Sequence, residues 1–518
     1  MDKTIAFILY FVVVLAIGIY FFIKSKGGDE KEYFLGGRSM GPYVTAMSAQ
    51  ASDMSAWLLM GFPGSILAFG MGKVWIGIGL ALGTALNWII VAARLRRFSK
   101  ASNDSITLPQ YLTNRFASKS SVLKVVCAVI FLISFTIYVA SAFTAGTDVL
   151  ADVMPDLFGS NKELAMVIFA VLILTYTFLG GYKAVCWTDF FQGILMLVAI
   201  LAVPIVMKAA GNFDSNMYTD VIKNTAADGT VTEFAFGTNP FKASFGDIVS
   251  GLGWGLGYFG MPHILVRFMS IKKASMIKKS ATVAIVWVFL SLGAAIVIAY
   301  LGRGFLLNDG SPLATTLLEA TGSGKLVFVK IVGNIFPGFI AGILLSAIIA
   351  ASMSTADSQL LVASSAFTSD IYKPLLRKEK ATEKEMLWVG RVVVLVVAIV
   401  AFFISRSGLS GNNPWATDIM NMVENAWGLF GASFGPVVIL SLFWKRFNYA
   451  GAVAGIIGGA VMDIVWLVLL TGSTGVYEIV PGFIVGLIVS VVVTLLTKAP
   501  SQEVIDIYNA ALNTEIDD

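Results

Sequence analysis

Long apolar runs limit what this chain of 518 residues can fold into more than any other feature. Only 13% of the residues are charged, compared with about a quarter in soluble proteins. A run of about 18 or more apolar residues is long enough to cross the hydrocarbon core of a bilayer as a helix. The strands of a membrane barrel would instead alternate apolar and polar residues in units of about ten. We therefore predict an all-α integral membrane protein with about 13 transmembrane helices. The predicted segments are 5–23, 43–68, 73–93, 121–146, 164–181, 184–206, 245–270, 281–303, 326–355, 386–405, 417–443, 449–471 and 475–497.

The positions of the basic residues predict the orientation in the bilayer. Most of the 36 lysines and arginines fall in one set of alternate loops, to which we also assign Arg267. Cytoplasmic loops carry such an excess, so we expect the N-terminus outside and the C-terminus in the cytoplasm. Residues 1–498 are predicted to form one transmembrane domain, and residues 499–518 a short cytoplasmic tail. The longest outer loop is expected at about 207–244.

The composition argues against several classes of function. A net charge of +4 gives no support for a nucleic-acid partner. Two cysteines and one histidine, His263, are too few for a disulfide framework, a zinc site or a Ser-His hydrolase. Residues 255–260 match the glycine pattern of a dinucleotide site, but no strand precedes them. We therefore predict that the chain is not an enzyme.

Carboxylates inside membrane helices are rare and costly, and four in or next to the predicted spans stand out. They are Asp53, Asp189, Asp357 and Glu424. The alternative for Asp53 is a cap at a helix break, and for Asp189 a helix cap at the interface. For Asp357 the alternative is a helix end that is exposed to water. We interpret Glu424 as an acid at a helix start or at the interface and assign it no role.

The second and seventh segments are both interrupted. Ser48, Asp53 and Ser55 form part of a polar patch in the second segment, and residues 251–262 contain five glycines and a proline. Irregular backbone at membrane depth is tolerated where it lines a cavity or is buried in protein. Paired interruptions in two halves of a transporter indicate a binding site near the midplane. The spacing is consistent with five-helix repeats formed by segments 2–6 and 7–11.

The ninth segment ends in a cluster of side-chain oxygens. Ser354 and Thr355 carry hydroxyls, and Ser354, Asp357 and Ser358 share one helical face. Sodium is a hard cation that prefers oxygen ligands, by the same logic as calcium. These oxygens, together with carbonyls freed where the second segment unwinds, predict a sodium site.

Several motifs carry a family resemblance along nearly the whole chain. They are residues 36–42 (GGRSMGP), 51–61 (ASDMSAWLLMG), 180–192 (GGYKAVCWTDFFQ), 253–263 (GWGLGYFGMPH) and 434–436 (FGP), the last after Trp427. The chain resembles the sodium:solute symporter family and, within it, the bacterial proline carriers. The resemblance implies a LeuT-type 5+5 inverted repeat in the inner membrane of a bacterium. It also implies import of L-proline by alternating access, with Na⁺ as the coupling ion. The protein would lie in the lipid bilayer and would need no obligate protein partner.

The resemblance also implies roles for individual residues. Asp53 would be linked to sodium binding and Arg38 to coupling. Asp357 stands where the proline carriers have a serine. Asp189, Asp357 and Ser358 would hold a second sodium ion, or Asp357 would titrate a proton. The implied sodium ligands are the carbonyls of Ala51, Met54 and Ala351 and the hydroxyls of Ser354 and Thr355; the implied substrate residues are Ser55, Tyr138, Trp254, Tyr258 and Pro262.

Other functions remain open at this point. Another small solute such as pantothenate would use the same fold. A transporter-like solute sensor would need a cytoplasmic signalling domain, for which the predicted tail is too short. A channel would conduct without saturation or coupling.

Overall fold

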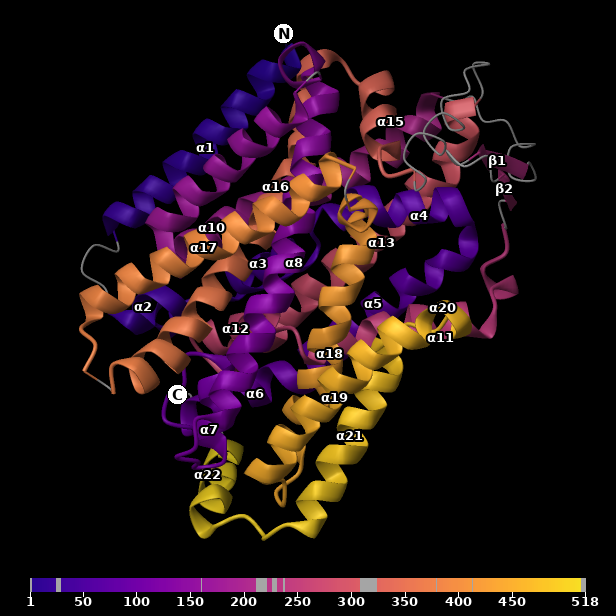
Figure 1. Ribbon diagram of the computed structural model, residues 1–518. Coiled ribbons are helices and arrows are strands. Elements are labelled where there is room, and N and C mark those ends of the chain that lie inside the picture. Colours follow the sequence, from indigo (N-terminus) through magenta and orange to yellow (C-terminus); the bar gives the residue numbers. More distant parts are fainter. Residues whose placement is uncertain are drawn as a thin grey trace.

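A computed structural model shows a bundle of long and short helices packed against one another (Figure 1). It describes residues 2–24, 29–159, 161–210, 221–225, 231–235, 238–307, 324–378, 380–411 and 413–513. Parts of the predicted outer loop and the last five residues of the predicted tail therefore lie outside the described residues. Within that loop, β1 (Val221–Thr225) and β2 (Val231–Ala235) pair antiparallel.

Ten spans of the described chain are long and apolar enough to cross a membrane. On the first helix, Ile5, Ile8 and Val12 are exposed while Phe7 and Tyr10 are buried, so one face is apolar and outward. Backbone polar groups have no water to bind in lipid, and a helix satisfies them within the segment. The main helices of these spans are α1 (Asp2–Lys24), α5 (Val74–Leu86), α6 (Ala92–Ala101), α8 (Val122–Val153), α10 (Lys162–Ala210), α13 (Ile277–Leu307), α16 (Gly338–Phe367), α17 (Glu383–Leu409), α18 (Ile419–Phe443), α19 (Tyr449–Leu469) and α21 (Ile479–Leu496).

The predicted segments 43–68 and 245–270 are both broken helices, as expected. The first consists of α3 (Pro42–Asp53) and α4 (Phe62–Phe69). The second consists of α11 (Phe245–Gly253), a 3₁₀ stretch (Trp254–Phe259) and α12 (Pro262–Ser270).

A sharp kink separates the fifth and sixth predicted segments, both of which lie in α10. Gly181 has φ 59° and ψ −170° there, a conformation that only glycine adopts readily. A Cβ at this position would also lie 2.9 Å from the Tyr33 ring. The number of membrane crossings, thirteen in the sequence analysis, stays a prediction.

The prediction of one helix over 326–355 is wrong. The segment is divided into α15 (Val327–Ile335) and α16, which starts after Pro337 and continues to Phe367. Pro337 is extended, with ψ 150°, and cannot donate a backbone hydrogen bond. The helix α16 packs against α1, α8 and α10 and is almost wholly buried, so it forms the centre of the bundle.

The two ends of the bundle differ. One end, here called the α22 end, holds α2 (Glu30–Leu35), α7 (Leu108–Arg115) and α22 (Gln502–Leu512) (Figure 1). The opposite end, here called the hairpin end, holds β1, β2, α15 and α20 (Thr471–Thr474).

Much of the predicted tail forms helix α22, which packs against α6. Arg115 donates to the carbonyl of Val504 in α22 across 3.2 Å.

Candidate ion and substrate site

The break between α3 and α4 frees backbone carbonyls in the middle of the bundle. The N–H of Ser55 bonds the carbonyl of Asp53 at 2.9 Å, and not that of Ala51 four residues back. Met54 leaves the helical region with ψ 75°. The carbonyl of Ala51 is therefore available to a group on another helix.

Three of the five predicted sodium ligands, Ala51, Ala351 and Ser354, meet where α3 passes α16. The hydroxyl of Ser354 donates to the carbonyl of Ala51 at 2.7 Å and approaches that of Ala351 at 3.2 Å. The hydroxyl of Thr355 is fully buried and makes no hydrogen bond within the part of the chain that the structure describes. Met54 is fully buried just beyond Asp53. Buried carbonyls and an unbonded hydroxyl fit a hard cation.

Asp53 is tied to the second broken helix. The hydroxyl of Tyr258 donates to its Oδ2 at 2.6 Å, while Oδ1 has no hydrogen-bond partner among the described residues. Asn87 supports this arrangement by donating to the carbonyl of Tyr258 at 2.9 Å. The two interrupted helices are thus connected through a buried carboxylate.

Aromatic side chains surround the same break. The ring of Trp254 lies 6.4 Å from those of Trp57 and Trp427, and Tyr258 meets Trp427 edge to face at 5.1 Å. The indole N–H of Trp427 donates to the carbonyl of Trp254 at 2.8 Å. A Cβ at Gly257 would lie 1.9 Å from that indole nitrogen, so the close approach requires glycine. The structure therefore brings two of the predicted substrate residues together with Trp427.

The other predicted substrate residues flank this group. Ser55 lies in the break itself, and its Oγ accepts weakly from the N–H of Trp57 at 3.4 Å. Pro262 is the first residue of α12, where a backbone N–H would have no acceptor within the helix, so proline does not destabilise the helix there. Tyr138 of α8 is fully buried, with its ring 6.5 Å from that of His263.

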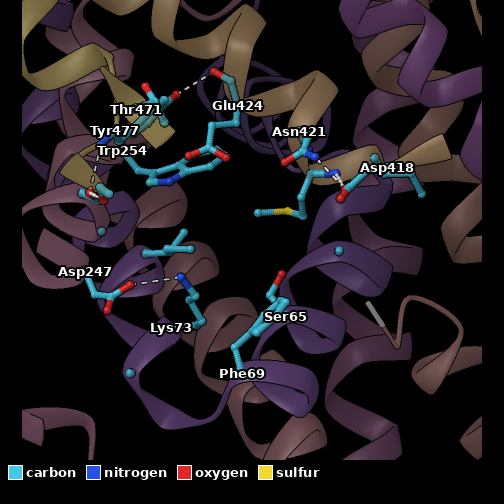
Figure 2. A pocket seen from close by; sticks show the side chains of 18 of the residues that line it. Ser65, Phe69, Lys73, Asp247, Trp254, Asp418, Asn421, Glu424, Thr471 and Tyr477 are labelled. Atoms are coloured by element: carbon cyan, nitrogen blue, oxygen red, sulfur yellow. Dashed lines mark hydrogen bonds and ion pairs between the residues drawn. The ribbon is translucent and has the colours of Figure 1, made fainter. Parts of the chain in front are cut away.

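A cavity of about 730 Å³ reaches Trp254 from the hairpin end. Figure 2 shows Trp254 and Glu424 on its wall, with Lys73 and Asp247 across from them. Lys73 and Asp247 form an ion pair at 3.1 Å. Glu424, to which the sequence analysis assigned no role, lines the cavity beside Tyr477, whose hydroxyl donates to the Glu424 carbonyl at 2.7 Å.

Arg38 connects several segments at the α22 end. Its guanidinium bonds Asp104 at 2.7 Å, Ser99 Oγ at 3.1 Å and the carbonyl of Ser105 at 2.8 Å, and it also bonds the carbonyl of Met269 in α12. The first loop is thereby fixed to the ends of α6 and α12.

A second arginine adds to these contacts. Arg96 of α6 donates to the carbonyls of Ile271 and Lys272 at 2.7 and 2.9 Å. Met40 pairs with Ile271 in a single β-bridge. The cavity therefore lies on one side of the broken helices, and these contacts lie on the other.

The second ion position implied by the resemblance, at Asp189, Asp357 and Ser358, contains an arginine that the sequence analysis placed in a loop. Arg267 is 1% exposed and lies in α12, not in a loop. Its guanidinium bonds Asp189 at 3.1 Å and also Ser358. Ser358 donates to Asp357 at 3.2 Å, so the structure brings these three predicted residues together around Arg267. An ionisable residue five positions into an apolar helix is the sequence signal that could have identified it.

Comparison with solved structures supports the fold. A sodium-coupled sialic acid symporter in a substrate-bound outward-open state matches 97% of this chain and 99% of its own, with a TM-score of 0.75 at 20% identity. The transporter MhsT, in complex with L-phenylalanine, matches 88% of this chain and 97% of its own, with a TM-score of 0.52 at 15% identity. The predicted LeuT-type fold is confirmed.

Comparison at the sequence level identifies the family. The family model for the sodium:solute symporter family matches residues 33–459. The sodium/proline symporter of Escherichia coli K12 is 43% identical over 96% of this chain and 93% of its own length. That of Staphylococcus aureus JH9 is 42% identical over 95% and 92%. The prediction of a transporter, and not an enzyme, is confirmed, and the chain is a multi-pass protein of the bacterial cell membrane that belongs to the sodium:solute symporter family.

Proposed function

We propose that this chain imports L-proline together with sodium by alternating access. The observation that carries the proposal is its identity of 43% with a sodium/proline symporter over nearly the full length of both chains. The geometry supports it, because candidate ion ligands, an aromatic cluster and a cavity meet at the two broken helices.

Sodium would bind first, between α3 and α16. Its ligands would be the carbonyls and hydroxyls around Ala51 and Ser354, which already touch. Coordination would hold the two helices together and fix the break in α3. Substrate and ion must then raise each other's affinity by the same factor.

Proline would bind next to the ion, at the broken helices. Its carboxylate would meet N–H groups at a helix start, where the dipole is positive. Its ring would pack on Trp254 and Tyr258, which lie at the inner end of the cavity and beside it. Ser55, Tyr138 and Pro262 would shape the remaining walls.

We further propose that the α22 end faces the cytoplasm and the hairpin end faces outward. The basic residues of the first loop, α6 and α7 gather at the α22 end, in agreement with the positive-inside rule. The N-terminus would then lie outside, and residues 499–518 would be a cytoplasmic tail of a single transmembrane domain that spans 1–498. The conformation described here would be open outward and closed inward.

Uptake into proteoliposomes tests the proposal. Labelled proline should accumulate above its outside concentration when sodium is high outside, and should not when potassium replaces sodium. Excess unlabelled proline should abolish the signal, and excess pantothenate should leave it unchanged. Folded protein that accumulates no proline under a sodium gradient would refute the proposed substrate.

A further inference from the structure

His263 is the single histidine of the chain, and its side chain is fully buried beside the broken helices. It is the second residue of α12 and directly follows Pro262, a predicted substrate residue. Neither ring nitrogen has a hydrogen-bond partner within the part of the chain that the structure describes. A neutral imidazole carries one donor and one acceptor. The proposed function gives this buried polar group no role so far.

The contacts of the imidazole show which way it points. Its ring meets that of Tyr138 at 6.5 Å with an interplanar angle of 87°, and that of Phe135 at 5.8 Å. Both rings belong to α8, so the side chain of His263 extends from α12 toward α8. The hydroxyl of Tyr138, another predicted substrate residue, is also fully buried and makes no hydrogen bond to a described residue. Two polar side chains from different helices therefore lie side by side without partners among the described residues.

The start of α12 is suited to a negatively charged group. Pro262 has no N–H, and the backbone N–H of His263, second in the helix, has no acceptor within the helix. Helix starts of this kind carry a partial positive charge and bind carboxylates. The carbonyl of His263 accepts from Nη1 of Arg267 at 2.7 Å, which fixes the backbone at this position. The imidazole thus extends from a fixed helix start that favours an anion.

A histidine that served packing alone would be expected to pair its ring nitrogens. A buried donor left without an acceptor costs more than a hydrogen bond contributes, and buried polar side chains nearly always have partners. Asp53 shows the same pattern at its Oδ1, and its charge acts on the hydroxyl of Tyr138. Polar atoms of α3, α8 and α12 that lack partners among the described residues therefore gather at the broken helices. Such an arrangement is expected of a site that binds a zwitterion.

We propose that His263 determines specificity in the solute site, because its imidazole N–H donates a hydrogen bond to the carboxylate of the transported proline. The inference rests on the proposed function and adds to it the side chain that recognises the carboxylate. The ring of proline is apolar, and a pocket that is only apolar discriminates weakly between similar molecules. A site built to bond a polar group rejects an analogue that lacks this group far more strongly. The contact with His263 would therefore separate proline from cyclic amines of the same size.

A distance between His263 and bound proline tests the contact in the wild type. Since the chain has one histidine, ¹⁵N-histidine labels a single imidazole when the purification tag contains none. Proline labelled with ¹³C at its carboxylate is bound in sodium, and rotational-echo double-resonance NMR measures the distance between the two labels. A hydrogen bond places the carboxylate carbon and the nearer ring nitrogen about 4 Å apart.

The outcomes of this measurement separate the inference from the proposed function. Bound proline whose carboxylate carbon lies more than about 6 Å from both ring nitrogens forms no hydrogen bond with them. That result would overturn the inference and leave sodium-coupled proline transport intact. Folded wild type that binds no proline would contradict the proposed function, and the inference with it.

Variants test whether the contact determines specificity. L-Prolinol carries a hydroxymethyl group in place of the carboxylate, and its inhibition of labelled-proline uptake is compared with that of unlabelled proline. The ratio of the two inhibition constants should fall about tenfold in H263F, which lacks the donor. H263N and H263Q keep an amide N–H, and at least one of them should restore the ratio.

F135L is the matched control, because it changes the packing of the imidazole but removes no hydrogen-bonding atom. Its ratio should stay near that of the wild type. An unchanged ratio in folded H263F would show that His263 only fills space. If H263F does not fold, the NMR distance in the wild type decides the matter.

Discussion

The hydroxyl of Ser354 donates to the carbonyl of Ala51 across 2.7 Å, which joins the centre of α16 to the last turn of α3. The contact exists because α3 breaks after Asp53 and leaves that carbonyl without its helical donor. An ion bound to both groups would stabilise the same helix pair. At about 2.3 kcal/mol per charge per 100 mV, the membrane potential would then add to the driving force.

Loss of the Thr355 hydroxyl should weaken sodium binding. We expect T355A to raise the sodium concentration for half-maximal proline uptake about tenfold, which corresponds to ~1.4 kcal/mol. S352A is the matched control, because the Ser352 hydroxyl bonds the Ile348 carbonyl of its own helix at 3.0 Å. An unchanged sodium requirement in T355A, at normal expression, would place the ion elsewhere.

Truncation of Trp254 should lower proline affinity more than sodium affinity. The side chain reaches the cavity and packs near Trp57 and Trp427. Aromatic contacts of this kind contribute about 0.5–1.5 kcal/mol beyond their buried area, so W254A should raise the KM for proline about tenfold. W466A is a suitable control, since Trp466 of α19 bonds the Val476 carbonyl. Equal affinities in W254A and wild type would remove Trp254 from the pocket.

The hydrogen bond between Tyr258 and Asp53 should link the solute site to the ion site. Y258F leaves the buried carboxylate without its donor, and an unsatisfied buried charge costs several times more than a lost hydrogen bond. We expect Y258F to weaken both sodium and proline binding about tenfold, whereas W254A should affect mainly proline. Isothermal titration with each ligand separates the two patterns. A Y258F variant that lost proline affinity alone would show that the bond does not connect the sites.

The broken helices were predictable because their signals are local. Five glycines before Pro262 weaken a helix wherever they occur, and the structure has a 3₁₀ stretch from Trp254 to Phe259. Ser354 and Thr355 could be placed on one helix, but their distance from Ala51 could not, because it depends on how α3 and α16 pack.

The buried contacts of Arg267 were missed because they, too, depend on how distant helices pack. Arg267 follows an apolar run and precedes Lys272 and Lys273, so it looked like part of a basic loop. The predicted segment 245–270 already contains Arg267, and in the structure Arg267 lies in α12 (Pro262–Ser270), inside the bundle. Its partners come from segments far apart in the sequence, and only tertiary packing brings them together. The division of 326–355 at Pro337 was also missed, because apolar residues continue on both sides of it.

Asp104 should keep the α22 end closed, and neutralising it should favour opening. Its carboxylate bonds Arg38 at 2.7 Å and also bonds Lys31. Ion pairs that are partly exposed contribute up to about 1 kcal/mol, so D104N should speed the labelling of a cysteine placed at Val44, in α3 near this end, about fivefold. D506N is the matched control, because Asp506 bonds only Gln502 within the part of the chain that the structure describes.

The pH dependence of this closure follows from the same contacts. Partial burial disfavours the charged form of Asp104, but Lys31 and Arg38 together outweigh burial and lower its pKa. A carboxylate with a lowered pKa contributes its stabilisation above the ordinary aspartate pKa of about 3.9 and loses it only as the pH falls through the lower, folded value. Only the thiolate reacts, so the labelling rate at position 44 is divided by that of a free thiol at the same pH, and this ratio should be constant between about pH 6 and 8. A ratio that rises as the pH falls within this range would mean that another group controls the closure.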